Sequence, residues 1–191
     1  MKNIVITLLI TASYLLNAQE ELGFQIPKKE LLDLIDVDLA PTVLRNTKNT
    51  VMVLLSRSTY KSIADLSRKE LRIAGLRVDP KRFIGSRTTY YNKVELVDFE
   101  KGKTPLLVDG LPNKPQLTNF IWSPDEKMIA MTHTSDSSVE LWILDVTTRK
   151  VKKLSSQPIN ATMGNSINWF KSSKELLVKL IPKDRLKNNK K

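Results

Sequence analysis

Short segments in which apolar and polar residues alternate, separated by turn-forming residues, cover most of the chain after residue 50. The segment "TTYYNKVELVDF" alternates in this way, with Tyr91, Val94, Leu96 and Phe99 as candidates for the buried side, and the turn "EKGK" leads into "TPLLV". An alternation of period two is typical of half-buried β-strands. The apolar, β-branched run in "TVMVLLSR" predicts another strand. The pattern therefore predicts a mainly β protein.

Residues 117–155 show the same pattern four times in succession. The strands "LTNFIW", "MIAMTHT", "VELWILDV" and "VKKLS" are joined by the turns "SPDEK", "SDSS" and "TTRK". Pro124 and Asp125 occupy turn-forming positions in the first of these turns. Four short antiparallel strands over roughly 40 residues are the unit of a β-propeller blade.

A propeller consists of repeats, and the chain repeats itself. "IWSPDEKMIAMT" matches "NWFKSSKELLVKL", so that Trp122 and Trp169, 47 residues apart, share one position. A weaker copy, "VLRNTKNTVMVLL", places Leu44 at the tryptophan position, and the longer interval after it indicates an insertion. The sequence predicts about two blades of four-stranded antiparallel sheet in a partial β-propeller. Trp122, Trp142 and Trp169 are then core residues of the blades.

Two segments have helical patterns. The first, "IPKKELLDLIDVD", has Pro27 at a position that a first helical turn tolerates, and an apolar side made of Leu31, Leu32, Leu34 and Ile35. The second, "KSIADLSRKELRIAG", has Ser62 and Asp65 as a capping pair and Gly75 as a stop. It predicts a short helix near residues 61–75, inserted between strands of the first blade.

The N-terminal residues 1–19 have the composition of a secretory signal peptide. Lys2 precedes an apolar run from Ile4 to Leu16, and the run ends at Asn17-Ala18-Gln19. The run is shorter than the ~20 residues of a membrane span, which predicts a signal helix that is cleaved near Ala18 or Gln19. We expect an exported protein, periplasmic or secreted, in a bacterium. Residues 20–182 would form the propeller part, and residues 183–191 a basic tail or truncated linker.

Composition and charge narrow the function classes. The 191 residues carry a net charge of +11, but the basic residues are spread along the chain without a nucleic-acid-binding motif, so no nucleic-acid partner is predicted. The chain has no cysteine and one histidine, which excludes disulfides, thiolate catalysis and multi-histidine zinc sites. The sequence predicts no cofactor and no metal. The aspartates Asp33, Asp36 and Asp38 lack the glycine and terminal glutamate of a calcium loop.

His133 lies among small polar residues in "THTSDSS" and is the one candidate for a catalytic base. A serine nucleophile also needs an oxyanion hole, usually on a strained Gly-x-Ser-x-Gly turn. The nearest match, "GNSIN", has Gly164 and Ser166 but ends in Asn168. We interpret His133 as a strand residue near a sheet end, followed by a β-turn, and predict no catalytic residue in the chain.

Several longer segments resemble a known family. "GFQIPKKELLDLIDVDLAPTVL", "LLSRS", "ELRIAGLRVDP" and "SRTTYY" follow one another in an order similar to the start of exported glutamyl endopeptidases, a branch of the prolyl oligopeptidase family of serine peptidases. The similarity continues through residues 117–155 and "INWFKSSKELLVKLIP". The resemblance implies the N-terminal propeller part of a peptidase, in which further blades and a C-terminal α/β-hydrolase domain with the catalytic serine, aspartate and histidine would follow.

The resemblance leaves two functional hypotheses. In the first, the chain is a propeller fragment of an exported serine endopeptidase that cleaves after glutamate, inactive alone and able to join the missing hydrolase part, with peptide substrates reached through the full-length enzyme. In the second, it is a free-standing exported binding module without enzymatic activity. Two blades leave apolar faces uncovered, since stacked repeats usually need at least three for stability.

Overall fold

The computed structural model describes residues 25–188, which divide into two compact units between Val37 and Asp38. The first unit contains one described helix, α2 (Lys29–Ile35), which confirms the helix predicted there. Pro27 lies one residue before the N-cap, Lys28, rather than inside the first turn. The predicted signal peptide, residues 1–19, lies outside the described residues. Within residues 25–188, no helix has the length and apolar character of a membrane span.

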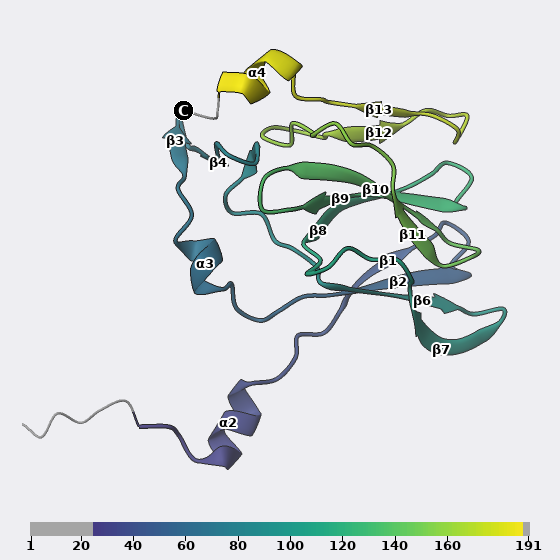
Figure 1. The fold of residues 1–191 in the computed structure, drawn as a ribbon. Helices are drawn as coiled ribbons and strands as arrows, with labels where there is room; N and C mark the ends of the chain where they lie inside the picture. The colour runs from purple at the N-terminus through teal and green to yellow at the C-terminus, as the bar shows by residue number, and fades with distance from the viewer. Residues whose placement is uncertain (1–24, 189–191) are drawn as a thin grey trace, which may run out of the picture. The chain divides into compact units, whose positions relative to one another are not determined.

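The second unit consists mainly of antiparallel sheets, which confirms the predicted mainly β class (Figure 1). The first sheet has the order β1-β2-β6-β7, and the second has the order β8-β9-β10-β11. Two further strands form a third sheet, β12-β13. The strand bounds are β1 Thr42–Arg45, β2 Val51–Ser56, β6 Lys93–Asp98, β7 Gly102–Leu107, β8 Leu117–Trp122, β9 Met128–Thr134, β10 Val139–Asp145, β11 Lys150–Lys153, β12 Ile167–Trp169 and β13 Leu176–Val178.

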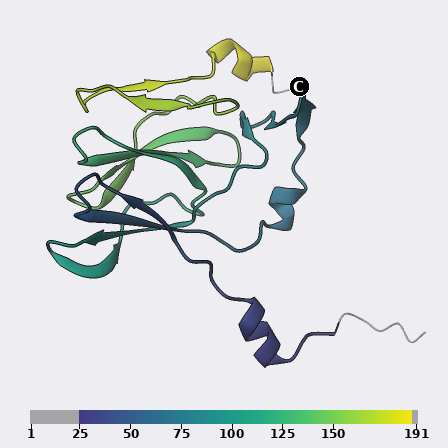
Figure 2. The same cartoon turned by 180° about the vertical axis from the view of Figure 1, so that it is seen from behind.

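The three sheets lie in layers, with one apolar cluster on each face of the middle sheet (Figures 1 and 2). Ile129 and Met131 of β9 belong to the cluster shared with the first sheet, whereas Ala130 belongs to the cluster shared with β12 and β13. This division follows from the alternation of side chains along a strand. Because both faces of β9 are covered, all but its first residue are buried.

The same type of β-hairpin occurs three times, as β1-β2, β8-β9 and β12-β13, at the start of each of these three sheets. The turn N–H of Asn49, Glu126 and Ser173 donates to the carbonyl three residues earlier, over 3.1, 2.8 and 3.0 Å. These three residues share a left-handed backbone, with φ of 54°, 58° and 59°. The predicted internal repeat is therefore present in the backbone itself.

The structure shifts the first repeat by one position. The strand pair nearest the turn is Trp122 with Ile129 in the second hairpin and Trp169 with Leu176 in the third, but Arg45 with Met52 in the first. Arg45, and not the predicted Leu44, therefore occupies the tryptophan position. The sequence match failed here because it aligned the apolar Leu44 with the tryptophans, whereas the turn carbonyls of Asn46, Ser123 and Phe170 are the equivalent positions and place Arg45 beside the turn.

The insertion, defined here as residues 57–92, lies between β2 and β6 of the first sheet. The helix predicted near residues 61–75 is wrong beyond its first turn. Helix α3 covers Ile63–Leu66, with the Ser62 side chain accepting from the Asp65 N–H as expected of the cap. The chain then forms a small antiparallel sheet, β3-β4-β5, with bounds Leu71–Ile73, Leu76–Asp79 and Ile84–Gly85. Gly75 lies in the hairpin turn between β3 and β4, with φ of 84°, and does not end a helix.

The insertion contacts the other sheets as well as its own. The Ala161 N–H, in the segment before β12, donates to the Phe83 carbonyl over 2.8 Å, and Tyr91 exchanges backbone hydrogen bonds with Leu117 of β8. At the end of the chain, residues Lys183–Asn188 of the predicted basic tail form helix α4. The sheets make no closed barrel within residues 25–188, and the propeller stays a prediction.

Candidate functional site

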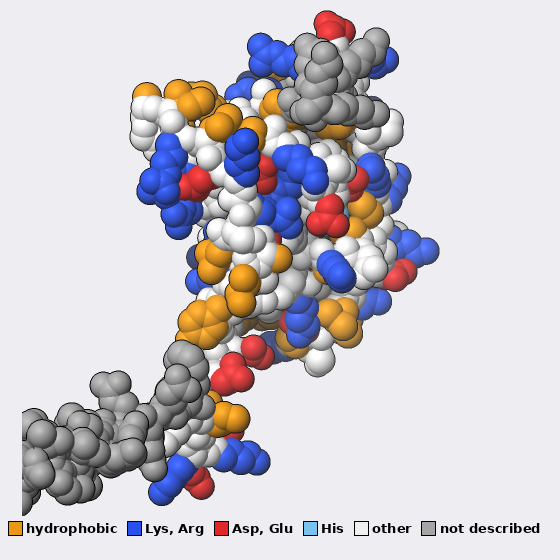
Figure 3. Space-filling model, turned by 60° about the vertical axis from the view of Figure 1, so that its left-hand side comes forward, with side chains coloured by type: hydrophobic (Ala, Val, Ile, Leu, Met, Phe, Trp, Pro, Cys, Tyr) orange, Lys and Arg blue, Asp and Glu red, His pale blue; other side chains and the backbone are white. Residues whose placement is uncertain are grey.

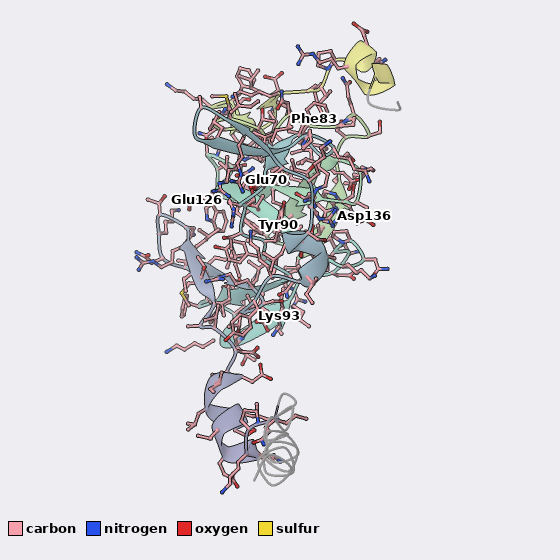
Figure 4. The ribbon with its side chains drawn as sticks, turned by 90° about the vertical axis from the view of Figure 1, so that its left-hand side faces the viewer. Glu70, Phe83, Tyr90, Lys93, Glu126 and Asp136 are labelled. Carbon is pink, nitrogen blue, oxygen red and sulfur yellow. The ribbon has the colours of Figure 1, made fainter. Side chains whose placement is uncertain are left out.

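A cleft of about 310 Å³ opens where the insertion leaves and rejoins the first sheet. Its walls come from residues 57–62, residues 86–92 and the segment before β8, and a second cleft of about 320 Å³ adjoins it. The two clefts share Lys61, Asp65, Arg82 and Ser86. Figure 4 views this side, with Glu70 one residue before β3 and Tyr90 near the end of the insertion. We treat both clefts together as the candidate site.

Basic side chains outnumber acidic ones around the candidate site (Figure 3). Within residues 25–188, Arg57 and Lys61 have no carboxylate within ion-pair distance, and the Lys61 ammonium donates to the Thr88 carbonyl over 3.1 Å. Cations that are not neutralised by a carboxylate leave a positive potential in a cleft and raise the local concentration of anions. The site is therefore suited to anionic or polar ligands.

The carboxylates of the site are already occupied by cations. Asp65 accepts from the Arg68 guanidinium over 3.3 Å, and Glu70 accepts from Arg72 and Arg77, both over 3.0 Å. A longer contact of 3.8 Å joins Arg68 to Asp136 of the β9–β10 turn. The Arg68 pairs link α3 to the β9–β10 turn, and the Glu70 pairs brace the β3–β4 hairpin.

A buried ion pair forms the floor of the site. The Arg82 Nε donates to Asp79 Oδ2 over 2.7 Å, and the two side chains are 4% and 5% exposed. The other oxygen of Asp79 accepts the backbone N–H groups of Lys81 and Arg82. Gln116, just before β8, accepts from Arg82 Nη1 and donates to Asp65 Oδ1, each over 3.5 Å. The floor thus fixes the insertion against the second sheet.

The protonation states follow from these bonds. Partial burial raises the pKa of Asp65, but hydrogen bonds from Ser62, Arg68 and Gln116 outweigh it and hold that pKa below its usual value. The Ser86 hydroxyl, followed by Arg72, likewise holds the pKa of Glu70 below its usual value. Both groups are therefore ionised at neutral pH. They can hold cations and accept hydrogen bonds, but they do not serve as general acids.

Tyr90 brings a buried hydroxyl to the wall of the cleft. Burial raises the pKa of Tyr90, an effect that the neighbouring Thr134 hydroxyl and the Arg82 charge partly oppose. Although the Tyr90 and Thr134 hydroxyls influence one another, neither has a partner with the geometry of a full hydrogen bond among residues 25–188. The Tyr90 hydroxyl is therefore kept neutral and retains hydrogen-bonding capacity.

His133 lies in a separate place, at the end of β9, as the sequence predicted. Its Nδ1 is 3.2 Å from Glu140 Oε2 on the neighbouring strand β10, and its ring meets the Trp142 ring edge to face, with centroids 5.9 Å apart. The Glu140 carboxylate also accepts hydrogen bonds from the Trp142 indole and the Lys153 ammonium. Burial raises the pKa of Glu140, but these donors, Lys153 first, bring it below its usual value.

The serines near His133 bond within their own turn. The Ser135 hydroxyl donates to the Ser138 carbonyl over 3.0 Å and accepts the Ser138 N–H, which confirms the predicted β-turn. The structure thus joins His133 to a carboxylate but not to these serine hydroxyls. Ser166 of the "GNSIN" segment is buried beside Asn119, whose side-chain amide donates to it over 3.5 Å.

The other candidates from the sequence lie apart from the clefts. Asp33 and Asp36 belong to the α2 unit, and within residues 25–188 no group of three or more acidic or histidine side chains is arranged to hold a metal. The three tryptophans pack against the two apolar clusters, Trp122 and Trp142 on one and Trp169 on the other, as predicted of core residues. The Trp169 indole also donates to the Ile121 carbonyl over 3.0 Å.

The candidate site itself was not predicted from the sequence. The capping pair Ser62 and Asp65 was recognised, but as part of a helix and not as the edge of a cleft. Arg82 and Asp79 carry a sequence signal, since a carboxylate three residues before an arginine in a tight turn can pair with it. The contribution of Gln116 comes from a distant segment, and local patterns contain no information on it.

Comparisons with known proteins point to one class. No family model matches the chain. A protein of Oryza sativa subsp. japonica described as "Probable glutamyl endopeptidase, chloroplastic" is 26% identical over 176 residues, which cover 86% of this chain and 19% of the relative. A protein of Arabidopsis thaliana with the same description is 28% identical over 174 residues, covering 85% of this chain and 18% of the relative.

Two conclusions follow from the fold, the site and the comparisons. The chain is a mainly β protein with antiparallel sheets and a cation-lined cleft. It is related, distantly, to a family of peptidases, and it spans about a fifth of the length of the curated relatives it matches.

Proposed function

We propose that the chain is the N-terminal propeller portion of an exported serine-type peptidase, and that it guides peptides toward a hydrolase domain outside this sequence. The observation that supports this proposal most strongly is the similarity to glutamyl endopeptidases over 85% and 86% of the chain. The two four-stranded antiparallel sheets and the thrice-repeated hairpin are consistent with propeller blades.

The cation-lined cleft gives this role a physical basis. A peptide substrate with glutamate carries a carboxylate, and Arg57 and Lys61 present charges that no carboxylate within residues 25–188 neutralises. Such charges steer an anionic peptide toward the cleft without cleaving it. The ionised Asp65 would then repel a carboxylate that entered deeply, so the Arg57 and Lys61 side of the cleft is the favoured position.

A free-standing binding module is the second candidate. The cleft is complete within residues 57–116, and its floor is fixed by the buried Arg82–Asp79 pair. A site of this kind needs no further domain to bind a ligand. In this alternative the protein is exported, binds acidic peptides or envelope components, and has no enzymatic role.

A binding and turnover assay tests both candidates. A fluorescent peptide rich in glutamate is titrated with the purified chain and compared with the same peptide in which glutamine replaces glutamate. We expect the acidic peptide to bind more tightly than the glutamine peptide. Lys61→Glu should weaken its binding by roughly fivefold or more, because replacing an attractive charge with a repulsive one costs at least about 1 kcal/mol. Lys101→Glu, in the turn between β6 and β7 and outside both clefts, is the control and leaves binding unchanged.

The outcomes separate the hypotheses. Equal binding of the two peptides would contradict the role of the cleft. Cleavage of a glutamate-containing chromogenic peptide by the chain alone would contradict the assignment of hydrolysis to another domain, and turnover that persisted in His133→Ala would also exclude His133 as its base. If adding a downstream hydrolase polypeptide produces cleavage, the peptidase role is supported over the free-standing module.

Export is a separate part of the proposal and has its own test. We propose that residues 1–19 are removed during secretion, on the basis of the signal-like sequence alone. N-terminal sequencing of the protein recovered from the periplasm or medium is expected to begin near Gln19 or Glu20. A cytoplasmic protein that still begins at Met1 would refute it.

A further inference from the structure

A third cleft, of about 340 Å³, opens between the first and second sheets, and we call it the inter-sheet cleft. Its lining residues come from β2, from β6, β7 and the turn between them, and from the turn between β10 and β11. None of them lines the candidate site. Asn92, just before β6, belongs to the candidate site, whereas Asp98, the last residue of β6, lines the inter-sheet cleft. The two sites therefore lie at opposite ends of β6.

The apolar core forms the floor of the inter-sheet cleft. Leu96 is 4% exposed and belongs to the cluster that the first and second sheets share, and Val51 and Val146 pack against the same cluster. Leu106 of β7 also lines the cleft and is 49% exposed. An apolar cleft of roughly 300 Å³ or more with a few polar groups at its edge is typical of small-molecule sites.

An irregularity in β7 shapes one wall of the inter-sheet cleft. Leu96 pairs with Leu106 and Asp98 pairs with Gly102, so a step of two residues on β6 faces a step of four residues on β7. Extra residues in one strand of an antiparallel pair bend that strand and increase its twist, and β7 is curved (Figure 1). Thr104, within the irregular part, lines the cleft together with Leu106. The bent part of β7 therefore forms this wall.

One cation of the inter-sheet cleft has no counter-charge. The Asp98 carboxylate pairs with the Lys101 ammonium over 3.4 Å, and its other oxygen accepts two backbone N–H groups. Within residues 25–188, the Arg149 guanidinium makes no ion pair and no hydrogen bond. Thr104 and Thr147 add hydroxyl groups to the lining. The cleft thus combines an apolar floor with one uncompensated positive charge, which attracts an anion.

The neighbouring surface restricts where an anionic group can lie. A wider hollow continues from the inter-sheet cleft along the β1–β2 and β8–β9 turns. Acidic side chains outnumber basic ones in its lining, with Asp98, Glu100, Asp125 and Glu126 against Lys48, Lys101 and Lys127. A carboxylate is therefore repelled from the hollow and attracted to Arg149, in the β10–β11 turn.

We propose that the inter-sheet cleft binds a small amphipathic carboxylate, with its anionic head at Arg149 and its apolar body against Leu96 and Leu106. An apolar cavity of about 150 Å³ holds one benzene molecule, so a cleft of about 340 Å³ has room for roughly ten carbon atoms. A medium-chain fatty acid has this size and this charge. The proposed ligand occupies a different site from the acidic peptide, and the inference does not depend on the peptidase assignment.

NMR titration of the isotope-labelled full chain with decanoate tests the proposal. Decanoate is added at concentrations below those at which it forms micelles, and the methyl signals of valine and leucine are followed. We expect saturable shifts of the methyl groups that line the cleft, which are those of Val51, Leu96, Leu106 and Val146. The methyl signals of Ile63 and Leu66, which are exposed on α3 and lie outside the cleft, are expected to stay in place.

Two variants with matched controls test the head and the body of the ligand separately. Arg149→Gln should raise the Kd for decanoate by up to about fivefold, the range of an exposed ion pair. Leu106→Ser should raise it by roughly fourfold or more, the effect of at least one buried methylene. Leu107→Ser, at the next and more exposed position of β7, and Lys152→Gln on β11 lie outside the cleft and leave the Kd unchanged. An unchanged thermal midpoint of each free variant shows that the fold is intact.

Other results of the titration overturn the proposal. Decanol or decyltrimethylammonium that bound as tightly as decanoate would show that the cleft does not select a carboxylate. Shifts of the same size at Ile63 and Leu66 would identify a general association of the amphiphile with exposed apolar side chains. The absence of saturable shifts at the four lining residues, or a Kd that neither Arg149→Gln nor Leu106→Ser raised, would show that the inter-sheet cleft is not the site.

Discussion

Replacing Arg82 with methionine removes one half of the buried ion pair on the floor of the candidate site. The Arg82 Nε and Asp79 Oδ2 atoms are 2.7 Å apart, and both side chains are at most 5% exposed. Without the guanidinium, Asp79 keeps two backbone donors on Oδ1, but Oδ2 loses its cation in a place that water does not reach freely. A buried carboxylate left without its partner costs about 3–5 kcal/mol.

The cost is measurable by urea unfolding. With a slope of roughly 2 kcal/mol per molar urea for a domain of this size, Arg82→Met lowers the unfolding midpoint by about 2 M. Asp79→Asn combined with Arg82→Met removes both charges and is expected to recover roughly 2 kcal/mol of the loss. Lys101→Met is the matched control, because its pair with Asp98 is largely exposed and contributes about 0–1 kcal/mol.

A small effect would refute this reasoning. If Arg82→Met changed the unfolding free energy by less than about 1 kcal/mol, the pair would be behaving as an exposed one. If the double variant were no more stable than the single one, the loss would come from packing of the arginine stem and not from the unpaired charge.

Two further predictions address the backbone and the His133 region. Gly110 has φ of 84°, and an added Cβ would collide with the Val151 carbonyl oxygen, whereas Gly75 has the same φ with open space around it. Gly75→Ala is expected to lower the stability by about 1–2 kcal/mol, and Gly110→Ala by clearly more, as measured by thermal unfolding. Equal losses of stability in the two variants would contradict the collision. Since the pKa of Glu140 is depressed in the folded protein, its contribution is present at neutral pH and is lost as the pH falls through and below its ordinary value of 4.5. The stability difference between the wild type and Glu140→Gln should therefore shrink on acidification, and a difference that grew would reverse the sign of the linkage.

The strands could be predicted from the sequence because successive side chains of a strand point to opposite faces of its sheet. Where one face is buried, the sequence alternates between apolar and polar residues. Val94 and Leu96 are buried as the period-two pattern required, whereas Phe99, taken as a candidate for the same side, lies beyond the end of β6 and is 39% exposed. The turn between β8 and β9 was predictable as well, because proline and aspartate, here Pro124 and Asp125, favour turn conformations.

The insertion was predicted less well because two local signals competed. Ser62 and Asp65 start a helix, and the charged residues that follow are compatible with continuing it. "LRIAGLRVD" also reads as two short strands around a two-residue turn, in which Ala74 and Gly75 have φ of 47° and 84°. Pairing of Leu71 with Val78, together with the Glu70 contacts to Arg72 and Arg77, stabilises the hairpin over the helix.

The candidate site depends on contacts that no local pattern encodes. Gln116 and Arg82 meet across 34 positions of sequence, and Arg68 reaches Asp136 only because the insertion folds against the second sheet. Such contacts result from the order and stacking of the sheets. The sequence supplied the repeat and the resemblance, and the cleft required the structure.

Proton NMR tests most directly whether the third hairpin stacks on the second. The Trp169 indole N–H donates to the Ile121 carbonyl over 3.0 Å, and the Asp125 N–H donates to the Ser173 hydroxyl over 3.0 Å. We expect nuclear Overhauser contacts from the Trp169 indole proton to the backbone of Ile121 and Trp122. An indole proton of Trp169 that exchanges freely with water and shows no contact to β8 would contradict it.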